Sequence, residues 1–401
     1  MRMSKRISGF QASPIRRLVP YANDAKRRGV HVFHLNIGQP DIITPPQVIE
    51  AVRDYGRKII AYGQSEGELE LREALPSYYK SFGVDVAADD IMITTGGSEA
   101  IQFTFMTLCD PGDEVIVPEP YYTNVGAFAQ TASITLKPVT SRLEDGFTLP
   151  DIAHFEAMVT PKTRAIMLCS PNNPTGHIYT DEELRQILDL VKRLDIFLIV
   201  DEVYREFVYD GKRFTSVLSY PEYADRVVVV DSFSKRYSMC GARIGALVCK
   251  NKVVLEGAMK IAQARLCPPD IEQVAALAAV KTPQEYLDRV RDEYESRRDF
   301  IVNELHKIPG VLCSEPKGAF YLVAKLPVEN AEDFCIYLLR DFQLNGQTVM
   351  LAPAEGFYVT EGLGRDEVRI AYVLNTVDLK HAMACLKAAL ASYPGRKDPV
   401  A

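Results

Sequence analysis

The sequence lacks the patterns that mark several large classes of protein. Its eight cysteines include no C-x-x-C pair, and its six histidines include no H-E-x-x-H motif. We therefore expect no bound metal and no disulfide framework, and we interpret the cysteines as reduced thiols of a cytoplasmic protein. No stretch approaches the ~18 apolar residues of a membrane-spanning helix, and no apolar signal segment is evident, so no membrane partner is predicted.

Tryptophan is absent, so any aromatic ring in a binding site must be smaller. An excess of positive charge is absent too, because 46 Lys and Arg residues stand against 53 Asp and Glu residues, for a net charge of -7. This balance argues against an extended nucleic-acid face. The composition, 47% hydrophobic and 25% charged, is typical of a globular protein, and the length of 401 residues predicts two or three domains, or one large α/β domain with a smaller partner.

What recurs along the chain is a short apolar run, a polar or Gly/Pro loop, and then a helical pattern. Apolar runs of this kind are IMIT (91–94), AIML (165–168), FLIV (197–200) and VVVV (227–230). Strands that alternate with helices predict an α/β fold with a mainly parallel sheet, and ligands of such sheets bind beyond the carboxyl ends of the strands. Thr180 and Glu183 form a capping box that predicts the start of one of the helices.

The pattern of predicted elements changes after about residue 285, where a long amphipathic helix is predicted and is followed by strand-like segments with helical patterns between them. We predict a large ligand-binding domain over residues 46–285 and a smaller α+β domain over 286–401. Residues 1–45, rich in proline, are predicted to form an extended arm that joins the smaller domain.

Polar residues follow the apolar runs, and each of them alone has an ordinary interpretation. Gly97 could belong to a tight turn, Asp201 could cap one, and Asn173 lies in a loop of turn-forming residues. Lys235 could be a solvated loop residue, and Arg369 could lie on the surface.

Together these residues indicate one chemistry. A lysine can form a Schiff base with an aldehyde cofactor, and an acid can pair with a protonated ring nitrogen. Glycines at a helix start, two serines and Arg243 can surround a phosphate, and Arg369 can hold a carboxylate with two parallel bonds. This combination points to pyridoxal 5′-phosphate (PLP) acting on an amino acid.

The segments SPNNPTG, VDEVY and SFSKRYSMCGARIG, in this order and spacing, resemble those of the class I/II, fold-type I PLP-dependent aminotransferases. The resemblance extends from IGQPD near residue 38 to VRIAY near residue 370. It implies that Lys235 is the Schiff-base lysine and proton shuttle and that Asp201 pairs with the pyridinium nitrogen. Tyr204 and Asn173 are implied to bond the phenolate oxygen of the cofactor.

The resemblance also implies the remaining site residues. The phosphate group is expected to be held by a set of donors comprising Gly97, Ser98, Glu99, Ser232, Ser234 and Arg243. Tyr122 is expected to stack on the pyridine ring, and Gly38 and Arg369, with Asn173, to bind the substrate α-carboxylate. Tyr62 resembles the tyrosine that reaches the cofactor phosphate of a neighbouring subunit, which implies a homodimer with shared active sites.

The implied reaction is a ping-pong transamination between an α-amino acid and a 2-oxo acid, through a pyridoxamine phosphate form. We expect 2-oxoglutarate as acceptor and aspartate or an aromatic amino acid as donor. Two departures affect substrate choice. Glu355 lies in a late loop where many relatives have proline and glycine, and Arg265 does not match the usual position for a second substrate carboxylate. Arg265 is either a substrate residue or part of an ion pair at the subunit interface.

Other activities share much of this pattern. A PLP-dependent β-lyase would use almost the same residues and differ in what leaves after proton loss. Decarboxylase or synthase chemistry is disfavoured because Arg369 is positioned to hold the carboxylate. A non-enzymatic, ligand-sensing regulator would need an added DNA-binding module, and none is expected before residue 10 or so.

Overall fold

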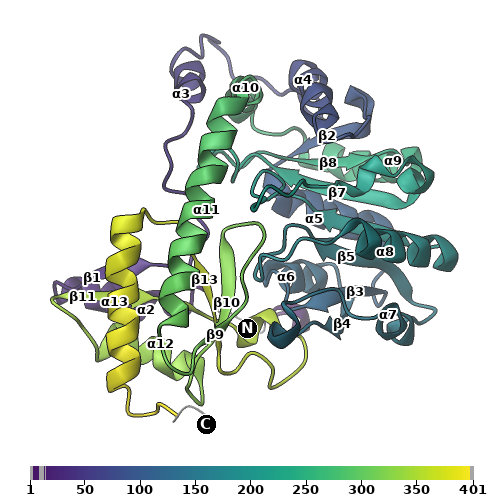
Figure 1. The fold of residues 1–401 in the computed structure, drawn as a ribbon. Helices are drawn as coiled ribbons and strands as arrows, with labels where there is room; N and C mark the ends of the chain where they lie inside the picture. The colour runs from purple at the N-terminus through teal and green to yellow at the C-terminus, as the bar shows by residue number, and fades with distance from the viewer. Residues whose placement is uncertain (1–2, 9–12, 14, 398–401) are drawn as a thin grey trace.

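The computed structural model describes residues 3–8, 13 and 15–397, and its largest element is a seven-stranded sheet (Figure 1). The strand order is β2-β8-β7-β6-β5-β3-β4, and all neighbouring pairs are parallel except the two that involve β8. The predicted mainly parallel sheet is therefore confirmed. Its strands are β2 Ile91–Thr94, β3 Glu114–Glu119, β4 Thr135–Thr140, β5 Thr163–Cys169, β6 Phe197–Asp201, β7 Val227–Ser232 and β8 Gly245–Cys249.

Helices cover both faces of this sheet, which explains why its central strands are continuous apolar runs rather than alternating ones. One buried cluster joins the sheet to α5, α6 and α9, and another joins it to α4, α8 and α10. These helices, with two that lie beside them, are α3 Pro46–Arg53, α4 Leu69–Lys80, α5 Gly96–Leu108, α6 Asn124–Thr131, α7 Ile152–Met158, α8 Asp181–Leu194, α9 Lys252–Arg265 and α10 Asp270–Val280.

The start of α8 follows from its sequence. The Thr180 side chain accepts a hydrogen bond from the Glu183 backbone N–H, and the Glu183 carboxylate accepts one from the Thr180 backbone N–H at 2.7 Å. The predicted capping box is confirmed, and it satisfies two N–H groups that the first turn of a helix leaves free.

A second region lies at the lower left of Figure 1 and is built on an antiparallel sheet of order β12-β13-β10-β9 and a parallel β1–β11 pair. Its buried cluster includes side chains from α2, α11, α12 and α13. The elements are β1 His31–His34, β9 Leu312–Cys313, β10 Tyr321–Lys325, β11 Gln347–Met350, β12 Ala352–Pro353, β13 Glu367–Ala371, α2 Val19–Arg27, α11 Gln284–His306, α12 Ala331–Arg340 and α13 Thr376–Ser392.

The described residues also form one short α-helix near the start of the chain and six 3-10 turns. These are α1 Lys5–Ser8, η1 Ala88–Asp90, η2 Leu143–Asp145, η3 Val217–Ser219, η4 Pro221–Arg226, η5 Cys240–Ala242 and η6 Glu355–Phe357. Within the described ranges, no helix is both long enough and apolar enough to cross a membrane. Parts of the predicted N-terminal arm and the last four residues lie outside the described residues, and the two predicted boundaries, after residues 45 and 285, stay predictions.

Candidate active site

A cavity of about 470 Å³ lies where the carboxyl ends of the central strands meet the start of α5 and the edge of the antiparallel sheet. Residues from distant parts of the chain therefore share one space, as expected for a ligand site of a parallel sheet. Twelve predicted site residues line the cavity: Gly38, Gly97, Ser98, Tyr122, Asn173, Asp201, Tyr204, Ser232, Ser234, Lys235, Arg243 and Arg369.

One end of the cavity is built from the N-terminus of α5 and the loop after β7. The Ser232 hydroxyl donates to the Ser234 hydroxyl at 2.9 Å. The Arg243 guanidinium lies against Gly96, where an added Cβ would be 2.7 Å from Nη2 of Arg243. Gly96 has a φ of +74°, which favours glycine, so both the backbone and the close approach require this residue. Helix N–H groups, hydroxyls and a guanidinium together suit a phosphate dianion.

Lys235 follows β7 and lines the cavity. Its Nζ donates a 2.7 Å hydrogen bond to the carbonyl oxygen of Gly38 and lies 3.7 Å from Sγ of Cys240. A Cβ on residue 38 would be 1.6 Å from the Tyr321 hydroxyl oxygen, so only glycine fits there. Both of these neighbours of Nζ are uncharged, and no carboxylate pairs with the amine among the described residues.

Asp201 ends β6 and is buried against the cavity wall. Its carboxylate accepts a 3.1 Å hydrogen bond from the Val203 backbone N–H. Burial raises the pKa of Asp201 to about 7, and the nearby acids Asp231 and Glu202 add to the rise. A cationic group beside Asp201 would lower this pKa and stabilise the buried carboxylate, so the position suits a protonated ring nitrogen.

Arg369 lines the cavity from β13 and is buried, with 2% of its surface exposed. Nη1 donates to Oδ1 of Asn173 at 3.1 Å and Nη2 donates to the Asn36 carbonyl oxygen at 2.5 Å. Over the described part of the chain it has no acidic partner, and its Nε has no hydrogen-bond partner. The alternative that Arg369 is a surface residue is wrong. A buried guanidinium without a carboxylate suits a ligand that brings one.

Tyr204 connects this arginine side of the cavity to the amide of Asn173. The Tyr204 hydroxyl lies 3.0 Å from the Tyr321 hydroxyl and 3.5 Å from Nδ2 of Asn173. Burial raises the pKa of Tyr204 well above its ordinary value, so the phenol keeps its proton and can donate a hydrogen bond.

Sequence reasoning missed several residues that line the cavity. Tyr321 is the clearest case, because the Arg369 guanidinium stacks over its ring at 4.6 Å. The sequence held a signal for Tyr321, because it is a polar-tipped residue at the start of an apolar strand, immediately after the segment Gly318–Phe320. In the structure Tyr321 pairs with Ala371 on the neighbouring strand. The other lining residues that the prediction did not include are Ser13, Ile15, Arg16, Ile37, Ile101, Asn124, Val203 and Cys240.

Two predicted residues do not line the cavity. The Glu99 carboxylate accepts hydrogen bonds from Nη1 of Arg265 at 2.7 Å and from the Thr95 backbone N–H at 2.8 Å. Its side chain is therefore engaged in an ion pair within the same chain, and Arg265 is engaged with it. Tyr62 is 81% exposed. A residue this exposed makes no contribution to the cavity of its own chain.

The cavity fits PLP chemically. It offers donors for a phosphate at one end, a buried acid for a ring nitrogen, a phenol and an amide for an oxygen substituent, and an amine for an aldehyde. Tyr122 lines the same cavity, and burial raises its pKa to about 12, so it is a neutral ring able to stack.

Comparisons with known proteins agree with this chemistry. A model of the family "Aminotransferase class I and II" matches residues 30–386. An aspartate aminotransferase of Rhizobium meliloti is 32% identical over 97% of this chain and 96% of its own length. A probable aspartate/prephenate aminotransferase of Aquifex aeolicus is 31% identical, with 97% and 98% covered.

Solved structures give the same result. The crystal structure of an aspartate aminotransferase from Thermotoga maritima superposes with a TM-score of 0.89 at 32% identity, covering 97% of this chain and 100% of that one. An alanine aminotransferase from Pyrococcus furiosus gives a TM-score of 0.87 at 30% identity, with 96% and 99% covered. The chain therefore belongs to the class I and II aminotransferase family and is a PLP-dependent enzyme that transfers amino groups between amino acids and 2-oxo acids.

Proposed function

We propose that this enzyme transfers the amino group of aspartate or an aromatic amino acid to 2-oxoglutarate in two half-reactions. The observation that carries the proposal is the buried Arg369, whose charge is unmatched by any acid in the described chain and which faces the cavity that holds Lys235. Relatives named for aspartate, at about a third identity over nearly the full chain, support the choice of donor.

The proposed roles follow from the contacts. Arg369 binds the α-carboxylate and so fixes the substrate Cα relative to Lys235, and Asn173 orients the guanidinium through its Oδ1. Nζ of Lys235 would then accept the proton of Cα and hold it for return later in the reaction. When bound, PLP supplies an electron sink for the charge that proton removal leaves. Asp201 stabilises that sink by keeping the ring nitrogen protonated.

The remaining residues hold the cofactor in place. Ser232, Ser234 and Arg243, with the first N–H groups of α5, bind the phosphate. Tyr204 and Asn173 bond the oxygen substituent of the ring, and Tyr122 stacks on its face. Glu99 acts indirectly, because its ion pair with Arg265 buttresses the first turn of α5. We therefore assign Arg265 to structure rather than to substrate binding.

A homodimer is part of the proposal. Tyr62 lies in the loop between α3 and α4, where other large apolar side chains are also exposed: Ile59 is 78% exposed and Ile60 65%. Exposed apolar side chains that gather on one loop are typical of a protein interface. We propose that this loop packs on a second copy and brings Tyr62 to the phosphate end of the partner's cavity.

The deciding experiment is a half-reaction screen. The enzyme loaded with PLP is mixed with single amino acids, and the visible absorption is followed in the absence of any 2-oxo acid. Aspartate or an aromatic amino acid should bleach it stoichiometrically, and 2-oxoglutarate should restore it. Strict preference for alanine or a branched-chain donor would refute the donor assignment. Continuous release of pyruvate and ammonia without an acceptor would show a β-lyase instead.

A further inference from the structure

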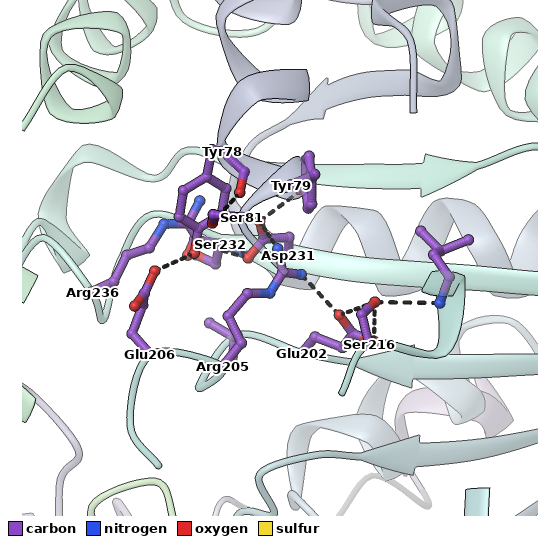
Figure 2. Close-up of polar contacts among 12 residues, drawn as sticks. Tyr78, Tyr79, Ser81, Glu202, Arg205, Glu206, Ser216, Asp231, Ser232 and Arg236 are labelled. Carbon is purple, nitrogen blue, oxygen red and sulfur yellow. Dashed lines mark hydrogen bonds and ion pairs between the residues drawn. The ribbon is translucent and has the colours of Figure 1, made fainter. Parts of the chain in front are cut away.

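Beneath the cavity floor lies a buried group of charged residues that the proposed chemistry does not use. Asp231 is 0% exposed and stands at its centre, one position before Ser232 and four before Lys235. Figure 2 shows Asp231 between Tyr79, Arg205 and Arg236, with Glu202 and Ser216 further along. Burying an ionised carboxylate costs several kcal/mol unless it is paired and hydrogen-bonded, so this arrangement needs an explanation.

Both oxygens of Asp231 are saturated. Oδ1 accepts hydrogen bonds from Nη1 of Arg236 and from the Ser232 backbone N–H, each at 2.7 Å. Oδ2 accepts one from the Tyr79 hydroxyl at 2.7 Å and lies 3.4 Å from Nη1 of Arg205. Although burial raises it, the two arginines hold the pKa of Asp231 below its ordinary value, so the group is a carboxylate.

Arg236 directly follows Lys235 and is also 0% exposed. Its Nη1 donates to the Ser232 carbonyl oxygen at 3.0 Å as well as to Asp231. Its guanidinium is covered by aromatic rings, with centroids at 4.5 Å for Tyr78 and 4.7 Å for Phe233. Among the described residues Asp231 is its single acidic partner. Asp231 thus accepts a hydrogen bond from the backbone N–H of Ser232, and Arg236 donates one to its carbonyl oxygen. Together the two side chains fix the backbone at the start of the segment that leads to Lys235.

The group continues to the neighbouring strand. Arg205 also donates to Glu202 at 3.1 Å, and Glu202 accepts from the Ser216 hydroxyl at 2.9 Å. Glu202 directly follows Asp201, the acid proposed to face the ring nitrogen. One buried chain of charges, Glu202–Arg205–Asp231–Arg236, therefore connects the residues next to Asp201, Ser232 and Lys235.

We propose that Asp231 and Arg236 are positioning residues that fix Ser232 and Lys235 relative to Asp201. With these positions fixed, Ser232 can bind the phosphate of PLP while Asp201 faces the ring nitrogen and Lys235 faces the aldehyde carbon. The inference concerns how the cofactor is held, and it does not depend on which amino acid is the donor.

Two adjacent tyrosines of α4 offer a matched test. Tyr79 donates to Asp231 at 2.7 Å, whereas Tyr78 donates to Glu206 at 2.8 Å. Phenylalanine at either position keeps the ring and removes one hydrogen bond to a carboxylate, which is the buried Asp231 for Tyr79 and the half-buried Glu206 for Tyr78. The PLP-loaded variants are compared by the rate of PLP release into a trap and by the pH titration of their visible absorption, with melting temperature as the measure of folding.

Tyr79→Phe should release PLP about 5-fold faster, the factor expected for one lost hydrogen bond, and Tyr78→Phe should stay within about 2-fold of the parent. Asp231→Asn, of nearly the same shape, should release PLP at least ~10-fold faster and lower the pH midpoint of the visible absorption, because Arg236 loses its counter-charge. Equal release rates for the two tyrosine variants would overturn the proposal. A folded Asp231→Asn protein with unchanged release and midpoint would also overturn it, and if this variant fails to fold, the tyrosine pair decides.

Discussion

At the scale of single residues, Arg369 is the strongest determinant of what the cavity accepts. Arg369→Lys keeps a positive charge but loses the planar fork that can hold a carboxylate with two bonds. We expect kcat/KM for amino acids to fall at least ~100-fold, since about 3 kcal/mol is reasonable for such a charge-assisted pair. Steady-state kinetics with the preferred donor measures it. A fall of less than ~10-fold would mean that the α-carboxylate is held elsewhere.

Asp201 gives a prediction about pH. Its pKa of about 7 in the folded state exceeds the ordinary value of 3.8, mainly because of burial. Between these two values the folded chain holds a proton that the unfolded chain has lost, so stability falls as pH rises from about 4 to about 7. The melting temperature of the cofactor-free protein should therefore drop further between about pH 5 and pH 8 than that of Asp201→Asn. Parallel pH profiles for the two proteins would contradict this.

The polar residues that follow apolar runs predicted part of the cavity wall, because polar side chains at the ends of buried strands are costly unless they have a use. Gly38, Tyr122 and Tyr204 were predicted only from the family resemblance, and all three line the cavity. Tyr321 and Cys240 were missed because tyrosine and cysteine are ordinary in strands and short turns. The buried state of Arg369 could not be read from alternation along β13, since all five positions of that strand are buried. Both of its faces are covered, which depends on packing that no local pattern records.

At the scale of elements, the start of α5 is the feature with the sharpest requirement. Gly96→Ala would place a Cβ 2.7 Å from Nη2 of Arg243 at a φ of +74°. We expect PLP to bind at least ~10-fold more weakly, because the guanidinium must leave the phosphate position. Gly112→Ala is the control, since its φ is +93° and nothing lies within 4 Å of the added Cβ.

Both alanine variants should lose about 1 kcal/mol of unfolding free energy from backbone strain. Only Gly96→Ala should lose cofactor affinity, as measured by equilibrium dialysis. Equal PLP affinities in the two variants would show that the position of the Arg243 guanidinium does not matter for binding the phosphate.

Elements were predicted best where local signals and tertiary needs agree, as at the capping box of α8. The reversed direction of β8 was not predicted. Its apolar run resembles that of a parallel strand, because β8 is buried on both faces like its neighbours. The direction of β8 depends on the path of the segment that joins it to β7 through η5 and the turn at Arg243. The length of this segment does not by itself show whether β8 runs parallel or antiparallel to β7.

At the scale of the whole molecule, the proposed dimer makes active sites that two chains share. Tyr62→Phe subunits mixed with Lys235→Ala subunits should form heterodimers in which one of the two sites has both native residues. Random exchange then restores about a quarter of all sites to full activity. Activity is measured after the subunits have been mixed and re-associated, and each variant alone serves as control. An active monomer in sedimentation would refute the shared site.

The pairing of β1 with β11 has a consequence for how the protein is made. His31 lies beside Gln347, 316 positions later in the chain. At a synthesis speed of 5–20 residues per second, roughly 15 to 60 s pass between the two strands leaving the ribosome. During this interval β1 lacks its native partner strand, and its apolar side chains Val32 and Phe33 have only the earlier α2 from the native cluster to pack against. The first strand of the described chain to be synthesised can therefore pair only after most of the chain has followed it, and we expect this two-stranded sheet to form late.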